Sequence, residues 1–266
     1  MEETMSHAVI HNYDAKPVTI ARVRDISTEH PWKWLSAGWQ DIKAAPALSL
    51  GYGLGLAIIS YLVSFSVITS GMYFLLPQLL AGFFLIAPLL AIGLYAISSQ
   101  LEAGERPSLL AGLKLARRNN FHIFNMGLVL IVSLIAWMIL AQLIVALTFT
   151  GITPSTWQGF LISLFASWDG FQLLVAGISC GAVIAFLIFS ISAISVPMLL
   201  DRNSNVFDAI QTSWSAVRHN LMPMFLWAAI LVVIIIAGFV TFYAGLVIGF
   251  PLAAHATWHA YRDLVE

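Results

Sequence analysis

Two histidines near the carboxyl end of the chain have the spacing that most suggests a chemical site. His255 and His259 are four residues apart, so on a helix their rings share one face and could bind a metal ion. Haem ligation by two histidines would need a second helix, which only His122 could provide near a membrane span. The same spacing suits a structural role in which both rings hydrogen-bond to neighbouring helices. Arg262 and Asp263 follow at once, which favours the structural interpretation.

The remaining polar residues form no recognisable catalytic set. The sequence contains no assembled triad, no pair of carboxylates, no zinc signature and no dinucleotide fingerprint. The single cysteine, Cys180, excludes an internal disulfide and lies in an apolar segment, where burial disfavours a reactive thiolate. Gln78, Gln142 and several serines are expected to hydrogen-bond between helices, with a pore or ligand lining as the alternative. We therefore predict no catalytic residue, no cofactor and no metal site.

The bulk composition places these residues in a membrane protein. Of 266 residues, 60% are hydrophobic and only 9% are charged, whereas soluble domains carry roughly 25% charged residues. The mean hydropathy is +0.89. A net charge of −1 gives no general basic surface for nucleic acid. Residues 1–30 lack the apolar core of a signal peptide, so we expect a cytoplasmic tail that is flexible to about Ile20.

Long stretches without charge define the membrane spans. A helix needs about 20 apolar residues to cross the hydrocarbon, and residues 44–101 and 119–168 contain no Asp, Glu, Lys or Arg. A turn at Ser70-Gly71 divides the first stretch, and Thr150 to Pro154 interrupts the second. The predicted segments are spans near 46–69, 72–98 and 121–148, an amphipathic piece at the outer interface from Trp157 to Trp168, and a fourth span near 171–200.

The last apolar region, Met222 to Tyr261, has room for two tightly joined spans. As a helix its 40 residues would extend about 60 Å, twice the hydrocarbon thickness. The turn is expected between Gly238 and Gly245. Six spans in total keep both termini on one side of the membrane. Because the basic residues lie in loops on that side, the positive-inside rule makes it cytoplasmic.

A threefold repeat organises the chain. The segments 37–43, 111–117 and 212–218 each contain a small pair, two apolar residues and a final cation, and each precedes an odd-numbered span. Trp32, Leu35, Trp39 and Ile42 correspond to Phe207, Ile210, Trp214 and Val217. The middle copy has Leu109, Leu113 and Ala116 at the last three positions, but Arg106 at the first. This spacing predicts a short amphipathic helix in the inner leaflet, with Asp41 away from its apolar face.

Lys43, Arg117 and Arg218 occupy one equivalent position of the repeat, at the end of each amphipathic helix. Arginines there most often reach lipid phosphates, and docking of a partner at Arg117 and Arg118 is the alternative. The predicted membrane-interface anchors are Trp32, Trp34, Trp39, Lys43, Arg117, Arg118, Trp214 and Arg218.

One part of the chain resembles a known family. The segment Pro31-Trp32-Lys33-Trp34-Leu35, followed by Gly38-Trp39, Asp41 and Pro46 to Gly53, is similar to the DUF2189 family of bacterial integral membrane proteins, and the resemblance extends from Ile26 onward. It implies no catalytic residues. Some members are labelled cytochrome c oxidase subunits or oxidases. This sequence lacks the intramembrane histidines of an oxidase catalytic subunit, and an accessory association with a respiratory complex is compatible with it.

The predicted fold is an all-α membrane protein with six transmembrane helices in three pseudo-repeated units. Each unit is an inner-leaflet amphipathic helix followed by a helical hairpin. Both termini are cytoplasmic, and the units cover approximately 31–99, 106–200 and 205–263 of a single domain, 31–266. No acid or base lies inside a predicted span, which disfavours ion-coupled transport. We expect a non-catalytic protein of the bacterial inner membrane whose partners are lipids and other membrane subunits. A passive channel, a transporter or a lipid-handling protein is the alternative.

Overall fold

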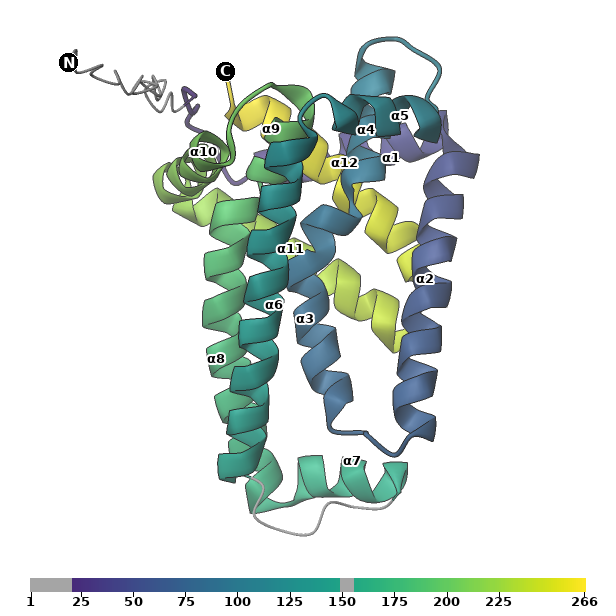
Figure 1. The fold of residues 1–266 in the computed structure, drawn as a ribbon, viewed down its shortest axis with the longest axis vertical. Helices are drawn as coiled ribbons and strands as arrows, with labels where there is room; N and C mark the ends of the chain where they lie inside the picture. The colour runs from purple at the N-terminus through teal and green to yellow at the C-terminus, as the bar shows by residue number, and fades with distance from the viewer. Residues whose placement is uncertain (1–20, 149–155) are drawn as a thin grey trace, which may run out of the picture.

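The chain is all-helical over the residues that the computed structural model describes, 21–148 and 156–266 (Figure 1). The helices are α1 (His30–Ala44), α2 (Pro46–Thr69), α3 (Leu75–Leu90), α4 (Ile92–Glu102), α5 (Leu109–Arg117), α6 (Asn120–Thr148), α7 (Trp157–Ala166), α8 (Trp168–Ser192), α9 (Ser195–Asp201), α10 (Val206–His219), α11 (Leu221–Val240) and α12 (Leu246–Leu264). In Figure 1, α2, α6 and α8 run nearly parallel to the long axis, while α11 and α12 slope across it. The short helices α1, α5, α9 and α10 gather at one end and α7 lies at the other.

Five segments of the described chain are long and apolar enough to cross a membrane. They are α2, the segment Leu75–Glu102 formed by α3 and α4, α6, the segment Trp168–Asp201 formed by α8 and α9, and α11. Their positions agree with the first five predicted spans. The region predicted to hold the sixth span contains a separate helix, α12, whose second half carries His255, His259 and Arg262. This polar half explains why α12 is not among the five.

The predicted turns lie where the helices end. Gly71 has φ +73°, in the left-handed region that glycine adopts without strain, and it lies two residues after the end of α2 at Thr69. The predicted turn between α11 and α12 is also present, although two non-glycine residues, Phe242 and Tyr243, take positive φ there. The hydroxyl of Tyr243 donates to Ser64 Oγ at 2.5 Å, which holds this turn against α2. The predicted break at 150–154 lies outside the described residues.

A proline lies near each of two interruptions in the long segments. Pro88 lies inside α3, and the helix breaks three residues later at Ala91. Pro197 lies in α9, just after the break at Ala193 and Ile194. Proline has no backbone N–H and its ring clashes with the carbonyl four residues earlier, so a regular helix cannot pass through it unchanged.

The helix α12 is the centre of the core. It packs against α1, α2, α4, α9 and α11, and its side chains include the fully buried Trp258 and Tyr261. Two glycines permit the close approach: a Cβ on Gly38 would lie 2.6 Å from the Ala256 backbone nitrogen, and one on Gly53 would lie 2.3 Å from the Val247 carbonyl oxygen. The most polar of the long helices is therefore surrounded by the others.

The segment just before α1 is hydrogen-bonded to distant parts of the chain. The Arg24 N–H donates to the Leu264 carbonyl at 2.9 Å, and the Glu266 N–H donates to the Arg22 carbonyl at 3.0 Å. The Ile26 N–H donates to the Asn220 side chain at 2.8 Å. Residues 21–26 thus lie beside the C-terminus. The remainder of the predicted tail, 1–20, falls outside the described residues.

Candidate functional site

The two histidines of α12 belong to a group of five side chains that we call the α12 polar cluster. Its members are Asp41 from α1, Ser49 from α2, Ser98 from α4, and His255 and His259 from α12. Because α12 approaches α1 and α2 at glycines, side chains from four helices meet on one of its faces.

The cluster is a continuous chain of hydrogen bonds. Ser49 Oγ lies 2.9 Å from His255 Nε2, and Ser98 Oγ lies 2.7 Å from His255 Nδ1. Ser98 donates to Asp41 Oδ2 at 2.6 Å, and His259 Nε2 lies 2.9 Å from the same carboxylate oxygen. The direct separation between His255 Nδ1 and Asp41 Oδ2 is 3.8 Å.

The donor and acceptor roles assign a tautomer to His255. Since Ser98 gives its proton to the carboxylate, its oxygen accepts from His255 Nδ1–H, and His255 Nε2 then accepts from the Ser49 hydroxyl. The order of groups is that of a serine nucleophile, a histidine base and an orienting acid, with Ser98 inserted between histidine and acid.

Burial decides what this arrangement can do. The exposed fraction is 0% for Ser49, 0% for His255 and 1% for Ser98. A nucleophile must reach its substrate, and in this structure Ser49 is closed off by the helices around it. The hydrogen bonds instead connect α12 to α1, α2 and α4. Both histidine rings hydrogen-bond to neighbouring helices, as the structural interpretation predicted.

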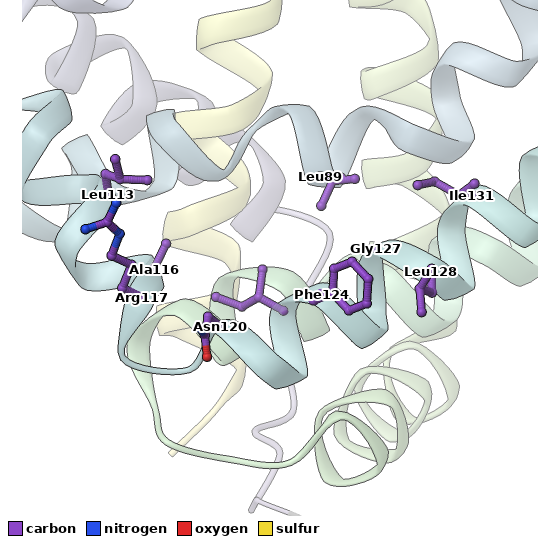
Figure 2. A pocket seen from close by; sticks show the side chains of 10 residues that line it. Leu89, Leu113, Ala116, Arg117, Asn120, Phe124, Gly127, Leu128 and Ile131 are labelled. Atoms are coloured by element: carbon purple, nitrogen blue, oxygen red, sulfur yellow. The ribbon is translucent and has the colours of Figure 1, made fainter.

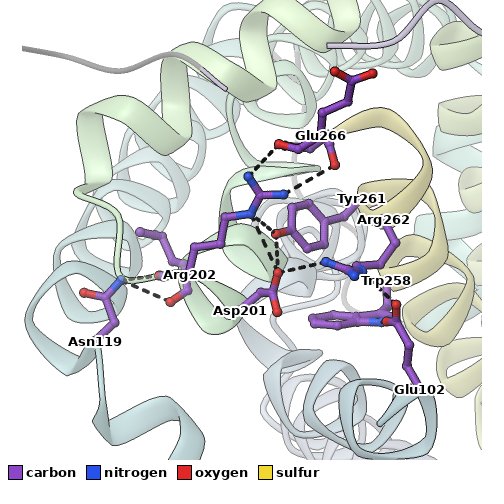
Figure 3. A network of polar contacts seen from close by, with 10 residues as sticks. Glu102, Asn119, Asp201, Arg202, Trp258, Tyr261, Arg262 and Glu266 are labelled. Carbon is purple, nitrogen blue, oxygen red and sulfur yellow. Dashed lines mark hydrogen bonds and ion pairs between the residues drawn. The ribbon is translucent and has the colours of Figure 1, made fainter. Parts of the chain in front are cut away.

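A second polar network lies at the C-terminal end of α12 (Figure 3). Tyr261 donates to Asp201 Oδ2 at 2.6 Å and accepts from Arg202 Nε at 2.8 Å. Arg202 also donates from Nη1 to the carbonyl of Glu266 at 2.8 Å. Arg262 contacts Asp201 Oδ2 at 3.2 Å. Both arginines therefore bond to other parts of the chain: Arg202 to Tyr261 and the chain terminus, and Arg262 to Asp201 of α9.

Glu102 extends this network to α4. It accepts from Trp258 Nε1 at 3.0 Å and from Arg262 Nε at 2.9 Å. Partial burial opposes the charge on Arg262. The hydrogen bond to Glu102 and the carboxylates of Glu102 and Asp201 outweigh that effect and raise the pKa of Arg262 above its ordinary value.

One predicted interface anchor is a core residue, and one predicted surface residue is buried. Trp34 is only 2% exposed: it donates to Asp263 Oδ2 at 2.8 Å and contacts the Trp227 ring edge-on. Asp41, expected on the helix surface, is buried in the α12 polar cluster. Both differ from expectation because α12 occupies the side of α1 that carries them, which no local spacing in α1 reveals.

The other predicted residues lie as follows. Trp32, Trp39 and Trp214 are exposed, and Lys43 Nζ lies 5.8 Å from the centre of the Trp39 ring. His122 does not join the histidines of α12; its Nδ1 accepts from the backbone N–H of Val206 at 3.4 Å. Within the described ranges, no group of three or more His, Cys, Asp or Glu could hold a metal ion.

A groove opens at the junction of α3, α5 and α6 (Figure 2). Its volume is about 340 Å³, and it is lined by Leu89, Leu113, Ala116, Arg117, Asn120, Ile123, Phe124, Gly127, Leu128 and Ile131. Arg117 and Asn120 lie at one end, and the rest of the lining is apolar. The predicted anchor Arg117 is thus part of a surface hollow. Arg118, beside it, is exposed and does not line the groove.

Sequence reasoning missed Asp41, Ser49 and Ser98 as partners of the histidines. The available signal was the pair Gly38 and Asp41, which are three residues apart and share a helical face. A glycine on the same face as a lone acid marks a place where another helix comes close enough to bury that acid.

Comparison with known proteins gives a family for the central helices. The family model DUF2189, described as a predicted integral membrane protein, matches residues 75–201, from α3 through α9. The Trp-rich segment 31–53, on which the resemblance was expected, lies outside the matched range. No curated protein and no solved structure matches the chain. The expected resemblance is confirmed over residues 75–201, which carry the sequence pattern of the DUF2189 family of predicted integral membrane proteins.

Proposed function

We propose that this protein is a non-catalytic, six-span protein of the bacterial cytoplasmic membrane that serves as an accessory or assembly subunit of a larger membrane complex, such as a respiratory oxidase. The burial of the α12 polar cluster is the observation that supports a non-catalytic role. The side chains best suited to chemistry, Ser49 and His255, have no exposed surface and connect helices instead. What remains accessible on the membrane-crossing helices is mainly apolar surface.

The contact between the two ends of the described chain supports an even number of crossings. Val23 and Val265 form an antiparallel bridge, so the segment before α1 and the C-terminus lie on the same side of the molecule. Five crossings would separate them. A sixth crossing by α12, paired with α11 as a hairpin, brings them together. The basic residues of α1, α5 and α10 at this end favour the cytoplasmic side.

The exposure pattern of α1, α5 and α10 supports the repeat. In α1 and α10 the first and third apolar positions, Trp32 with Trp39 and Phe207 with Trp214, are exposed. The fourth positions, Ile42 and Val217, are buried in both. In α5 the residues equivalent to the exposed ones include Leu113, which is exposed as well. Each helix therefore offers large apolar side chains to an interface, as an inner-leaflet helix would.

The outer face of α2 supports a protein partner. A Cβ added at Gly51 or at Gly55 would meet no atom within 4 Å, so both glycines face open space. Glycines four residues apart on a membrane helix let a second helix approach closely. Ile58, Ile59 and Leu62 continue this exposed face along the helix. A helix of another subunit fits it.

Purification in mild detergent followed by native mass spectrometry tests the accessory role. We expect stoichiometric subunits of a larger complex with the wild-type protein and their loss with Gly51→Leu/Gly55→Leu. Gly177→Leu, at another glycine with open space around it, is the matched control and should keep the partners. Recovery of the wild-type protein only as a monomer or homo-oligomer would contradict the proposal.

A fluorophosphonate probe tests the non-catalytic assignment separately. We expect no labelling of Ser49 in native membranes because its hydroxyl is buried and the probe cannot reach it. Labelling that disappears in Ser49→Ala and in His255→Ala would show an accessible, activated serine. That result would make the α12 polar cluster an active site.

A further inference from the structure

The groove at α3, α5 and α6 has the shape and chemistry of a site for one phospholipid chain. From Asn120 to Ile131 the groove follows α6 for eleven helical rises, about 16 Å at 1.5 Å per residue. This length is about half of a 30 Å hydrocarbon core, or one leaflet. Gly127 deepens the groove because it has no side chain; a Cβ at this position would lie 3.5 Å from Leu89 Cδ1.

The cation at the end of the groove is unpaired within the described part of the chain. Over residues 21–148 and 156–266, Arg117 makes no ion pair and no side-chain hydrogen bond. Arg202 and Arg262, by contrast, are held by carboxylates and carbonyls. Arg117 is also in the last turn of α5, directly before the apolar length of α6. An unpaired guanidinium beside an apolar channel is complementary to an anionic headgroup attached to a hydrocarbon chain.

A second, more polar groove lies at α8 and α10 and contains two positions equivalent to residues of the first. It has a volume of about 420 Å³ and is lined by Ile191, Ile210, Gln211, Trp214, Ser215, Arg218 and His219. In the repeat, Trp214 is equivalent to Leu113 and Arg218 to Arg117. Both grooves thus place the third apolar position and the terminal cation of an amphipathic helix in one hollow.

We propose that the groove at α3, α5 and α6 is a binding site for one membrane phospholipid. Its phosphate binds the Arg117 guanidinium, with the Asn120 side chain beside it, and one acyl chain lies along Phe124 and Ile131. The proposal goes beyond the accessory role, because it requires α6 to lie in the membrane and requires no protein partner.

Lipid titration of the purified full-length protein tests the headgroup contact. Delipidated protein in mild detergent receives phosphatidylglycerol at increasing concentration, and native mass spectrometry counts the bound lipid. All variants carry Arg218→Gln, so that the second groove does not contribute. We expect Arg117→Gln to weaken binding about fivefold and Arg118→Gln, an adjacent exposed arginine outside the groove, to leave it unchanged. Equal binding by Arg117→Gln, or equal weakening by Arg118→Gln, would overturn the proposal.

Filling the groove tests the acyl-chain contact. Gly127→Leu puts a branched side chain where the chain should lie, and we expect the retained lipid to fall at least as far as in Arg117→Gln. Gly177→Leu on α8, where a side chain meets open space, is the matched control. Thermal unfolding without lipid confirms that each variant is folded. Undiminished binding by folded Gly127→Leu would show that no acyl chain occupies the groove.

Discussion

The α12 polar cluster and the groove beside Arg117 differ in whether their polar side chains have partners within the protein. In the cluster, Asp41 accepts from both Ser98 and His259, and Asp41, Ser49, Ser98 and His255 are buried. At the groove, Arg117 has no partner among residues 21–148 and 156–266 and lies next to an apolar channel. The difference separates residues that hold the fold together from residues available to bind something else. His255 and His259, whose spacing resembles a metal site, belong to the residues that hold the fold together. Arg117 belongs to the residues available for binding.

Removing the acid at the centre of the cluster should give the largest loss of stability. Asp41→Ala deletes the acceptor of two hydrogen bonds and leaves the buried Ser98 and the partly buried His259 without that partner. We expect the free energy of unfolding to fall by about 3 kcal/mol. Denaturation in mixed micelles measures the change. Asp25→Ala, at an exposed acid, is the control. An equal loss of stability there would show that the hydrogen bonds of the cluster do not account for the effect of Asp41→Ala.

The close approach of α2 to α12 should be the next most sensitive feature. Gly53→Ala places a methyl group 2.3 Å from the Val247 carbonyl oxygen, so the helices must separate, at a cost of about 1–3 kcal/mol. Gly55→Ala, half a turn further along α2, meets no atom within 4 Å. Its stability should stay the same or rise by up to about 1 kcal/mol. Similar effects of the two substitutions would mean that α12 does not pack on α2 as the structure has it.

A smaller effect is expected at an arginine that is engaged but partly exposed. Arg202→Gln removes the contacts to Tyr261 and to the Glu266 carbonyl. We expect a loss of about 1 kcal/mol in unfolding free energy, because each hydrogen bond also competes with water. Tyr61→Phe, which removes an exposed hydroxyl, provides a baseline. If Arg202→Gln left the free energy of unfolding unchanged, this network would contribute no more to stability than an exposed surface ion pair.

The smallest effect on stability is expected at the groove. Arg117→Gln removes a charge that contacts no carboxylate in the described part of the chain. In lipid-free micelles the free energy of unfolding should change by less than about 0.5 kcal/mol. A loss as large as that of Arg202→Gln would assign Arg117 a structural role and contradict the contrast between the two regions.

The sequence predicts the membrane helices well and the interior poorly. The charge-free stretches place the first span near 46–69, where α2 lies, and the Ser70-Gly71 turn follows from glycine chemistry. These features depend on local composition. The burial of Trp34 and Asp41 depends on α12, more than 200 residues further along the chain. The groove was not predicted because it arises where α3, α5 and α6 meet, although the cation in it, Arg117, was singled out by the repeat.

One measurement compares the two regions directly: the thermal unfolding midpoint of Arg202→Gln and Arg117→Gln, with and without phosphatidylglycerol, in the Arg218→Gln background. A ligand that binds the native state raises its stability. We predict that Arg202→Gln lowers the lipid-free midpoint and keeps the full increase on lipid addition. Arg117→Gln should keep the lipid-free midpoint and lose most of that increase. Loss of the lipid-free midpoint in Arg117→Gln, or an undiminished lipid response, would contradict the account.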